Sequence, residues 1–390
     1  MVVAKTFAMD TRVRREAKAL ASHGFHVQIL CWDRQGKRSS TEMIDQCRVR
    51  NIRLGRSTEL YSSRLYYLIA ALLFQVIVFL WALKQIKKTR ALVLHVHDFN
   101  TLFGSVMVRW LLKERVRLVY DCHELTPGIY QEWYGSLISQ IVGQLEFAAL
   151  RFVDAIIAAN EAIQLHLCGV REGRVAVVYS CPAIEEIPEV HSPEAKRKLG
   201  LCDVFVVLFS GRARQDYDLD MILNTARDMK EKHVSGFRFV FIGPPDTIAY
   251  LFDTVINERL QDLFDFRGWV ADEDLFLYYI ASDLCFAVTR DLGPNTRVLT
   301  PIKLFESMAC GVPVAVRDGT LASKIVQHWH CGIVVNAKQA TFSAELRGLK
   351  DNPEELRRLG AAGRNAFRTR YSGNLMEEKL LQLYTELQSA

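Results

Sequence analysis

Two arginines follow a short apolar run in the second half of the chain. The run Phe205–Phe209 is typical of a buried strand, and Ser210-Gly211-Arg212 comes directly after it, with Arg214 close behind. A glycine at a strand end leaves room for a ligand, and the planar fork of an arginine matches the oxygens of a phosphate. We therefore expect Gly211, Arg212 and Arg214 to meet a diphosphate. The alternative is a loop with ordinary surface arginines.

A helix pattern farther along carries a second pair of charged side chains. The segment 301–314, PIKLFESMACGVPV, has Pro301 where helices begin and Gly311 where they end, and a buried strand follows. Lys303 and Glu306 lie three residues apart, so they share a face near the helix start, where free N–H groups attract an anion. Lys303 can meet a phosphate, and Glu306 can accept hydrogen bonds from a ribose diol. The alternative is a plain surface ion pair.

Histidines and carboxylates end two strand-like runs in the first half of the chain. HVHD at 95–98 closes one run, and DCHE at 121–124 closes the other. His123 is either a core histidine bonded to a backbone carbonyl or part of a site, and its position between two acidic residues at a strand end favours a site. His95 is expected to point to the opposite face of its strand from His97, so it is left out of the site.

These motifs resemble the family-four retaining glycosyltransferases of GT-B fold. The string P-x-K-L-F-E-x-M-A-x-G-x-P-V, which follows a Gly-Arg pair at the first strand of the same domain, resembles the donor site of that family. DTRVRREA at 10–17 resembles its first loop and helix, and 95–98 and 121–124 resemble its strand-end motifs. The resemblance extends from Val2 to the last helix, and the order and spacing of the motifs make it specific.

The resemblance implies a role for individual residues of the donor side. Arg212 and Lys303 would hold the donor diphosphate, and Glu306 the ribose. Gly243 and the turn at Val270 would leave room for the base. The remaining donor-side residues are Gly211, Arg214 and Leu304.

The resemblance also implies catalytic residues and an acceptor side. His123 is at the position that faces the transferred sugar in similar enzymes, and it would act with Arg212 and Lys303. Asp10 and Arg12, at the start of the first helix, would lie where an acceptor phosphate or the donor is met. The acceptor-side residues are Asp10, Arg12, His97, Asp98 and Glu124.

The chemistry implied is transfer of a sugar from a nucleotide-diphosphate sugar, with UDP favoured over GDP. Arg212, Lys303 and a helix N-terminus supply the positive potential that the departing diphosphate needs, so we expect neither a cofactor nor a metal. Asp218-Leu219-Asp220 has the Asp-x-Asp form of metal-dependent transferases, but it opens a helix pattern. We predict that it is a helix N-terminus.

The chain departs from the family pattern at two places. Val298 stands where many members have a second glutamate, eight residues before Glu306. The lysine usually found soon after the Gly-Arg pair is missing, and Arg214 is its candidate replacement. Val298 leaves one alternative open, a catalytically weak scaffold subunit of GT-B fold. A further alternative, from the same fold with a different reaction, is a nucleotide-sugar epimerase or phosphorylase.

Thirteen β-branched runs alternate with helix patterns, which predicts the α/β class with parallel sheets. We expect two Rossmann-like, doubly wound domains facing a central cleft, with residues 1–182 as the acceptor domain and 199–372 as the donor domain. Residues 183–198 would be a linker, and 373–390 a terminal helix that packs back on the first domain. The predicted strands are 2–5, 26–32, 48–54, 91–97, 116–123, 155–160, 175–180, 205–211, 237–243, 264–270, 284–290, 313–318 and 332–337.

Charge and cysteine usage narrow the class of protein. Residues 1–180 carry 24 Lys and Arg against 15 Asp and Glu, a balance of +9, although the whole chain carries only +5. The first half is therefore expected to bind an anionic partner. Nucleic acid is not the favoured partner, because the basic residues form no known nucleic-acid-binding pattern. The nine cysteines show no metal or disulfide spacing, and residues 1–7 lack the features of a secretory signal, which favours a cytoplasmic protein.

One uncharged run stands apart from the rest of the sequence. Leu65–Leu83 is interrupted by a single polar residue, Gln75, and basic residues flank it: Arg53, Arg56, Arg64, Lys84, Lys87, Lys88 and Arg90. Spanning a membrane would separate strands of one sheet, so we expect either an interfacial helix or a core helix. The first interpretation predicts peripheral attachment to the inner face of an anionic membrane and a lipid-linked or membrane-proximal glycan acceptor.

Overall fold

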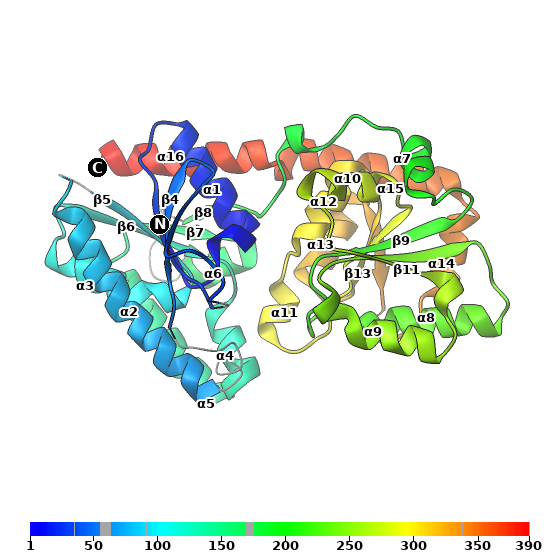
Figure 1. Cartoon of the computed structure of the whole chain (residues 1–390), viewed down its shortest axis with the longest axis horizontal. Helices are drawn as coiled ribbons and strands as arrows, with labels where there is room; N and C mark the ends of the chain where they lie inside the picture. Colours follow the sequence, from blue (N-terminus) through cyan, green and yellow to red (C-terminus); the bar gives the residue numbers. More distant parts are fainter. Residues whose placement is uncertain (35, 55–63, 90–91, 169–174, 337, 390) are drawn as a thin grey trace. The chain divides into compact units, whose positions relative to one another are not determined.

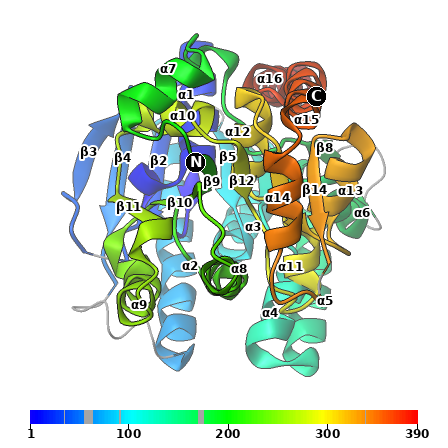
Figure 2. The same cartoon turned by 90° about the vertical axis from the view of Figure 1, so that its right-hand side faces the viewer.

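The chain folds into two compact α/β units. Unit 1 comprises Met1–Ser180 and Leu375–Ala390, and unit 2 comprises Cys181–Asn374. Helices cover both faces of a mostly parallel sheet in each unit, so the predicted class is confirmed (Figures 1 and 2). The computed structural model describes residues 1–34, 36–54, 64–89, 92–168, 175–336 and 338–389. The predicted positions Arg56, Arg90, Ala91 and Ala337 lie outside the described residues.

The sheet of unit 1 reverses its strand order next to its first strand. β1 pairs in parallel with both β2 and β5, where Val2 lies opposite Leu30 and Val96. Ligands of doubly wound sheets bind beside such a reversal, at the carboxyl ends of the strands. The strand order is β3 (Thr41–Ile44), β4 (Cys47–Ile52), β2 (Gln28–Trp32), β1 (Val2–Val3), β5 (Leu92–His97), β6 (Val116–Cys122), β7 (Ala155–Ala158) and β8 (Val175–Val177).

The helices of unit 1 lie on the two faces of this sheet. α1 (Thr11–Ser22) and α16 (Gly373–Ser389) lie on one face, and α2 (Arg64–Ile86), α3 (Leu102–Leu111) and α5 (Ser136–Leu150) lie on the other (Figure 1). Two shorter helices, α4 (Thr126–Tyr134) and α6 (Glu161–Cys168), follow β6 and β7. The grouping of residues 375–390 with unit 1 agrees with the expected position of the terminal helix.

Helix α2 is apolar all round but only one side of it is buried. Ala70, Phe74 and Val78 belong to the core of unit 1, whereas Leu72 and Val76 are 69% and 55% exposed. By length and composition, Tyr66–Ile86 is long enough to cross a membrane. However, it packs on a sheet whose strands come from both before and after it in the chain. The core-helix alternative is thus confirmed for one face of α2, and the interfacial alternative stays a prediction for the exposed face.

Unit 2 has a six-stranded parallel sheet that reverses its order between β9 and β12. Figure 2 shows α8, α9 and α14 on one face and α10, α12 and α15 on the other. The strand order is β11 (Phe264–Gly268), β10 (Phe237–Ile242), β9 (Phe205–Ser210), β12 (Leu284–Phe286), β13 (Val314–Arg317) and β14 (Gly332–Val335). The helices are α7 (Ser192–Leu199), α8 (Leu219–Glu231), α9 (Pro245–Asn257), α10 (Asp272–Ile280), α11 (Pro294–Val298), α12 (Ile302–Cys310), α13 (Leu321–Trp329), α14 (Ser343–Lys350) and α15 (Pro353–Ala366).

Two parts of the structure differ from the sequence prediction. Strand β3 was not predicted, because its hairpin turns through Asp45 and Gln46, which both have positive φ, in place of the Asn-Gly or Asp-Gly pair that usually signals such a turn. The predicted linker 183–198 is not structureless throughout. Its last residues form α7, where Ala195 is fully buried and Lys196 forms a 2.6 Å ion pair with Asp283.

Gly104 allows α3 to approach α2 at the one polar residue of the apolar run. A Cβ atom at Gly104 would lie 2.2 Å from the backbone oxygen of Gln75, and the Gly104 N–H donates to Gln75 Oε1 at 2.8 Å. We predict that Gly104→Ala destabilises the protein by about 1–3 kcal/mol, because the two helices must separate. The denaturant midpoint measures this loss. Gly348→Ala, on α14 with open space around it, is the control and should not lower the midpoint. If both variants lower the midpoint equally, the close approach of α2 and α3 is not the cause of the loss.

Candidate functional site

Asp121 is the centre of a buried charged cluster at the carboxyl ends of the unit 1 strands. It is fully buried near the end of β6. One carboxylate oxygen accepts a hydrogen bond from Arg12 Nη2 at 2.7 Å, and the other lies 3.0 Å from His123 Nε2 and 3.1 Å from His97 Nδ1. Burial alone would raise the pKa of Asp121, but Arg12 and His123 outweigh it and hold that pKa well below its usual value. Asp121 is therefore an anion that orients three side chains.

Arg12 and Asp10 lie at the start of α1, where the sequence placed them, but their polar atoms bond within the protein. The Arg12 guanidinium is 7% exposed and donates to Asp121 and to the carbonyl oxygen of Val178. Asp10 caps α1, accepting a hydrogen bond from the N–H of Val13 at 3.1 Å. This geometry makes Arg12 a positioning residue rather than one that faces an open acceptor surface.

His123 is held between two carboxylates. Its backbone N–H donates to Asp98 Oδ1 at 3.1 Å, and its ring lies 3.7 Å from Asp98 Oδ2 and 3.0 Å from Asp121. Burial opposes a charge on the ring, but the two carboxylates outweigh it and raise the pKa of His123 to about 9. His123 is therefore an imidazolium at neutral pH, which fits a site residue better than a core histidine bonded to a carbonyl.

Asp98 and Glu124 complete the predicted acceptor side. Asp98 has a φ of 64°, an unusual conformation for a residue other than glycine, and Lys5 Nζ lies 3.3 Å from its carboxylate. Burial would raise the pKa of Asp98, but His123 and Lys5 lower it to about 2. Asp98, with Glu124 as a weaker contributor, raises the pKa of Lys5 above its usual range. This edge of the sheet is therefore a patch of paired charges.

The prediction for His95 was wrong. Residues two apart on a strand share a face, and the rings of His95 and His97 stack with centroids 4.4 Å apart. His95 Nδ1 lies 2.9 Å from the hydroxyl of Tyr384 on α16, so the terminal helix covers this side of the cluster. Burial, with the neighbouring His95 second, lowers the pKa of His97 to about 3, so His97 is neutral beside the charged His123.

Four side chains of the cluster are of types that bind metal ions. Atoms of Glu16, His95, His97 and Asp121 all lie within 4.8 Å of one another, and all four residues are buried. However, Arg12 lies 3.2 Å from Glu16 and 2.7 Å from Asp121, so a cation already faces both carboxyl groups. A metal ion would be repelled by this guanidinium at close range. We interpret the cluster as a charge network that fixes His97 and His123.

Two glycines bring the ends of β9 and β10 together in unit 2. A Cβ atom at Gly243 would lie 2.3 Å from the backbone oxygen of Gly211, and Gly211 has a φ of 96°. The missing side chain of Gly243 therefore makes room for Gly211 as well as for any base. Arg212 follows, half-buried, and its guanidinium has no hydrogen bond or ion pair within the described part of the chain. Its full charge remains available to a ligand.

Lys303 lies on two aromatic rings in the first turn of α12. The helix begins and ends as predicted, with Pro301 and Gly311 as its caps. Lys303 is 3% exposed, and its Nζ lies 3.5 Å from the ring centre of Tyr217 and 4.5 Å from that of Phe209. Aromatic faces attract a cation without neutralising it. This arrangement differs from a surface ion pair with Glu306, and it gives Lys303 aromatic partners in place of a carboxylate within the described part of the chain.

Glu306 lies one turn later and ends a chain of hydroxyl groups. Its Oε2 accepts a hydrogen bond from Tyr279 at 2.7 Å, and the Tyr279 hydroxyl lies 2.6 Å from that of Ser210. The carboxylate is 6% exposed, so these bonds fix its orientation. The neighbouring Leu304 is apolar and fully buried, which makes its side chain part of the core.

The remaining donor-side predictions fall at the edge of this region. Arg214 pairs with Asp216 at 2.8 Å, and Val270 is half-buried two residues after the end of β11. The Asp-x-Asp sequence caps and opens α8, as predicted. Asp220 lies 2.6 Å from Arg290, so an arginine already faces that carboxylate.

Sequence reasoning missed the residues that hold the predicted ones. Asp121, Tyr217 and Tyr279 are partners of His123, Lys303 and Glu306. Tyr217 lies in the loop before α8, and Tyr279 lies on α10. Asp121 had a usable signal, because it lies two residues before His123 in the same strand-end motif. Tyr217 stands in the region of the missing lysine, but nothing in the sequence shows its contact with Lys303.

Two family models match the two halves of the chain. A model described as glycosyl transferase 4-like domain matches residues 8–181, and one described as glycosyl transferases group 1 matches residues 192–366. The chain is a family-four glycosyltransferase. A search of curated proteins found no match.

Solved structures of similar fold cover nearly the whole glycosyltransferase. Sucrose-phosphate synthase from Thermosynechococcus elongatus is 18% identical, with a TM-score of 0.73, and the match covers 100% of this chain and 99% of that one. HepE from Anabaena, solved with UDP, is 14% identical (TM-score 0.69, coverage 100% and 99%). The α,α-trehalose 6-phosphate synthase from Burkholderia multivorans is 11% identical (TM-score 0.71, coverage 100% and 98%). At these identities the likeness establishes the GT-B fold alone.

The charge on His123 can be measured directly. We predict that an NMR titration of its imidazole has a midpoint near 9, against the ordinary 6.5. Since the folded state binds this proton more tightly than the unfolded chain, the stabilisation from His123 is full below pH 6.5 and is lost as the pH rises through about 9.

The matched variant for this titration is Asp98→Asn, which removes one of the two carboxylates that raise the pKa. Its midpoint should move down, towards the ordinary value. A wild-type midpoint at or below 6.5, or a midpoint that does not respond to Asp98→Asn, would overturn the assignment.

Proposed function

We propose that this enzyme transfers a hexosyl or N-acetylhexosaminyl group from a UDP-sugar to a lipid-linked or membrane-proximal glycan at the inner face of a membrane, with retention at the anomeric carbon. The observation that carries the acceptor part is an exposed apolar surface on unit 1 that begins beside the His123 cluster. The donor part is supported by the fixed cations of unit 2.

The apolar surface is formed by three helices on one face of the sheet. α2, α3 and α5 lie on the same face of the sheet, and α3 contacts both α2 and α5 (Figure 1). Each of the three helices leaves large apolar side chains open to solvent. Apolar surfaces of this extent on a soluble protein usually mark a partner or a membrane. The exposed residues are Ile69, Leu72, Leu73, Val76 and Leu80 on α2, Met107, Trp110 and Leu111 on α3, and Leu137, Ile138, Ile141 and Leu145 on α5.

The start of α2 reaches the acceptor-side edge of the sheet. The hydroxyl of Tyr67 accepts a hydrogen bond from Asn100 at 2.9 Å, and Asn100 lies two residues after Asp98. The Tyr67 ring also contacts Trp133, which is 51% exposed on the helix that follows His123. An acceptor whose tail lies in lipid would therefore bring its sugar close to His123.

Positive charge favours an anionic bilayer as the partner of this surface. The first 180 residues carry a balance of +9, and Lys84, Lys87 and Lys88 come at the end of α2. Each Lys or Arg near an anionic surface contributes about 1 kcal/mol, so these three and the apolar face suffice for reversible attachment.

The proposed reaction breaks the bond between the anomeric carbon and the diphosphate, which leaves with the electron pair. The acceptor hydroxyl forms its bond on the same face of the sugar and gives its proton to the departing phosphate. Arg212, Lys303 and the α12 N-terminus would balance the charge on the leaving group, so no divalent metal is needed. His123 would donate a hydrogen bond to the sugar. UDP as the nucleotide is supported by the HepE structure, which contains it.

The test is transfer of radiolabel from a UDP-sugar into vesicles made from membranes of the source organism. We expect label in the lipid or lipid-linked glycan fraction, in the presence of EDTA. The double variant Leu73→Glu with Val76→Glu should lose most of this transfer while binding UDP like the parent, because both side chains are about half exposed and face away from the core.

The double variant Phe252→Glu with Ile256→Glu is the matched control, since it places the same two charges on exposed apolar positions of unit 2. It should transfer normally. Label that appears only in water-soluble products, or unchanged transfer by the double variant, would contradict the membrane acceptor. Transfer that is lost in EDTA and returns with a divalent metal would contradict the metal-independent reaction.

A further inference from the structure

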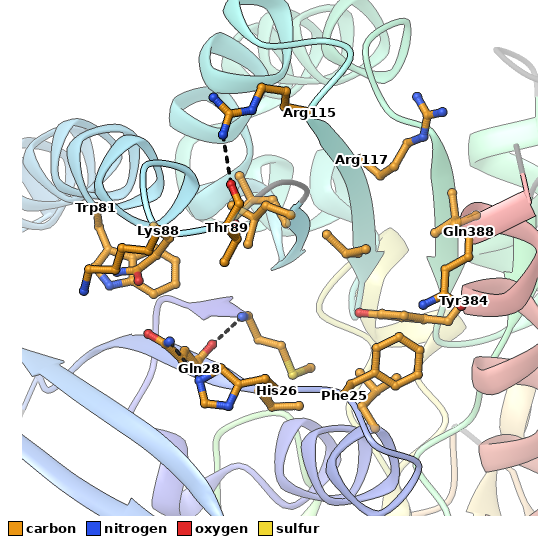
Figure 3. A pocket seen from close by; sticks show the side chains of 18 of the residues that line it. Phe25, His26, Gln28, Trp81, Lys88, Thr89, Arg115, Arg117, Tyr384 and Gln388 are labelled. Carbon is orange, nitrogen blue, oxygen red and sulfur yellow. Dashed lines mark hydrogen bonds between the residues drawn. The ribbon is translucent and has the colours of Figure 1, made fainter.

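An apolar cavity lies at the opposite edge of the unit 1 sheet, where the strands begin. It has a volume of about 530 Å³, within the range of small-molecule sites. Figure 3 shows Trp81 and Lys88 on one side of it and Tyr384 and Gln388 on the other. Most of its wall is apolar and includes Leu20, Phe25, Trp81, Leu92, Leu94 and Leu387.

The polar groups of this cavity are largely held by the protein itself. Arg115 Nη2 donates to the carbonyl oxygens of Ile86 and Thr89, both at 2.9 Å, and Figure 3 shows the bond to Thr89. Arg117 lies 3.9 Å from Asp154. The cavity therefore offers mainly apolar surface to a ligand.

A second cavity, of about 430 Å³, adjoins the first and has the opposite character. It lies between β4 and the end of α2, and none of the described residues that line it is an Asp or a Glu. Its cationic residues are Arg48, Arg50, Arg53, Lys84 and Lys88.

Four of these five cations have no ion pair within the described part of the chain. Arg53 lies 3.9 Å from Asp33, whereas Arg48, Arg50, Lys84 and Lys88 have no ion pair there. Like charges gathered around one cavity repel each other, and an anion placed among them would relieve that repulsion. The cavity is thus complementary to a phosphate group.

We propose that the two cavities together bind one molecule of an anionic phospholipid. They share the residues Gln28, Trp81, Gln85 and Lys88, so a single ligand can occupy both. The phosphate group lies among Arg48, Arg50 and Lys84, and an acyl chain fills the apolar cavity. The site lies at the carboxyl-terminal end of α2, where Lys84 and Lys88 line it. The exposed apolar face belongs to the same helix.

This lipid site is separate from the transfer chemistry. Strand β5 begins at Leu92, in the wall of the apolar cavity, and ends at His97 in the charged cluster. Leu92 and His97 lie five residues apart, which is about 17 Å along an extended strand. On the side nearest the cluster, Tyr384 forms the wall of the cavity, and its hydroxyl lies 2.9 Å from His95. The lipid is therefore an anchor rather than an acceptor. Its role as an anchor rests on the proposed function, but the binding itself does not.

The test uses short-chain phosphatidylglycerol below the concentration at which it forms micelles, with binding measured by calorimetry. No bilayer is present, so the result does not depend on insertion of α2. We expect tighter binding than for short-chain phosphatidylcholine or for glycerol phosphate, and an affinity that rises with chain length. Arg50→Gln and Lys84→Gln should each weaken binding about fivefold.

Lys87→Gln is the matched control, because Lys87 has the same charge beside α2 but lines neither cavity. It should bind like the parent. Equal binding of glycerol phosphate or phosphatidylcholine, no binding of phosphatidylglycerol, or equal effects of Lys84→Gln and Lys87→Gln would overturn the inference. If the protein binds short-chain phosphatidylglycerol but transfers no label into vesicles, only the proposed function is contradicted. If it transfers label into vesicles but does not bind short-chain phosphatidylglycerol, only this inference is contradicted.

Discussion

Unit 1 depends on a single buried carboxylate, that of Asp121. It holds Arg12, His97 and His123 from three different elements, and it is fully buried. An ionised group at that depth is tolerated only when cations and hydrogen bonds surround it. Removing Asp121 would leave Arg12 buried without its main partner and His123 without one of the two groups that keep it charged. The first helix, two strands and the candidate catalytic imidazolium are therefore linked through one side chain.

Unit 2 also buries a basic side chain, but its partners within the described residues are aromatic rings rather than a carboxylate. Lys303 is almost fully buried, and Phe209 and Tyr217 offer it aromatic faces in place of a carboxylate. An ion pair would have cancelled the charge that a diphosphate requires. Arg212 and the first turn of α12 add to the same positive region, which is why a metal is not needed in the proposed reaction.

Local sequence patterns predicted the helices and strands. They did not predict the side-chain contacts of these elements, because the contacting residues are distant in sequence. Every predicted strand corresponds to an observed one, because each is a short run rich in β-branched or aromatic residues and bounded by turn residues. The edge strand β3 was missed, since its exposed residues and its Asp45-Gln46 turn lack the usual signals. Arg12 and Asp121 lie 109 residues apart, so no local pattern could show that this arginine is buried against a carboxylate. The aromatic support of Lys303 was invisible for the same reason.

In the proposed reaction, cationic side chains that the fold of unit 2 holds in place bind the donor diphosphate. Calorimetry with UDP in EDTA measures this binding in the parent and in the Lys303→Ala and Arg212→Ala variants. Loss of one charge-assisted contact costs about 1.5–3 kcal/mol, so each variant should bind UDP about 10- to 100-fold more weakly while its fold is kept. If both variants bind UDP as tightly as the parent, or if UDP binds only when a divalent metal is added, Lys303 and Arg212 do not hold the diphosphate as proposed.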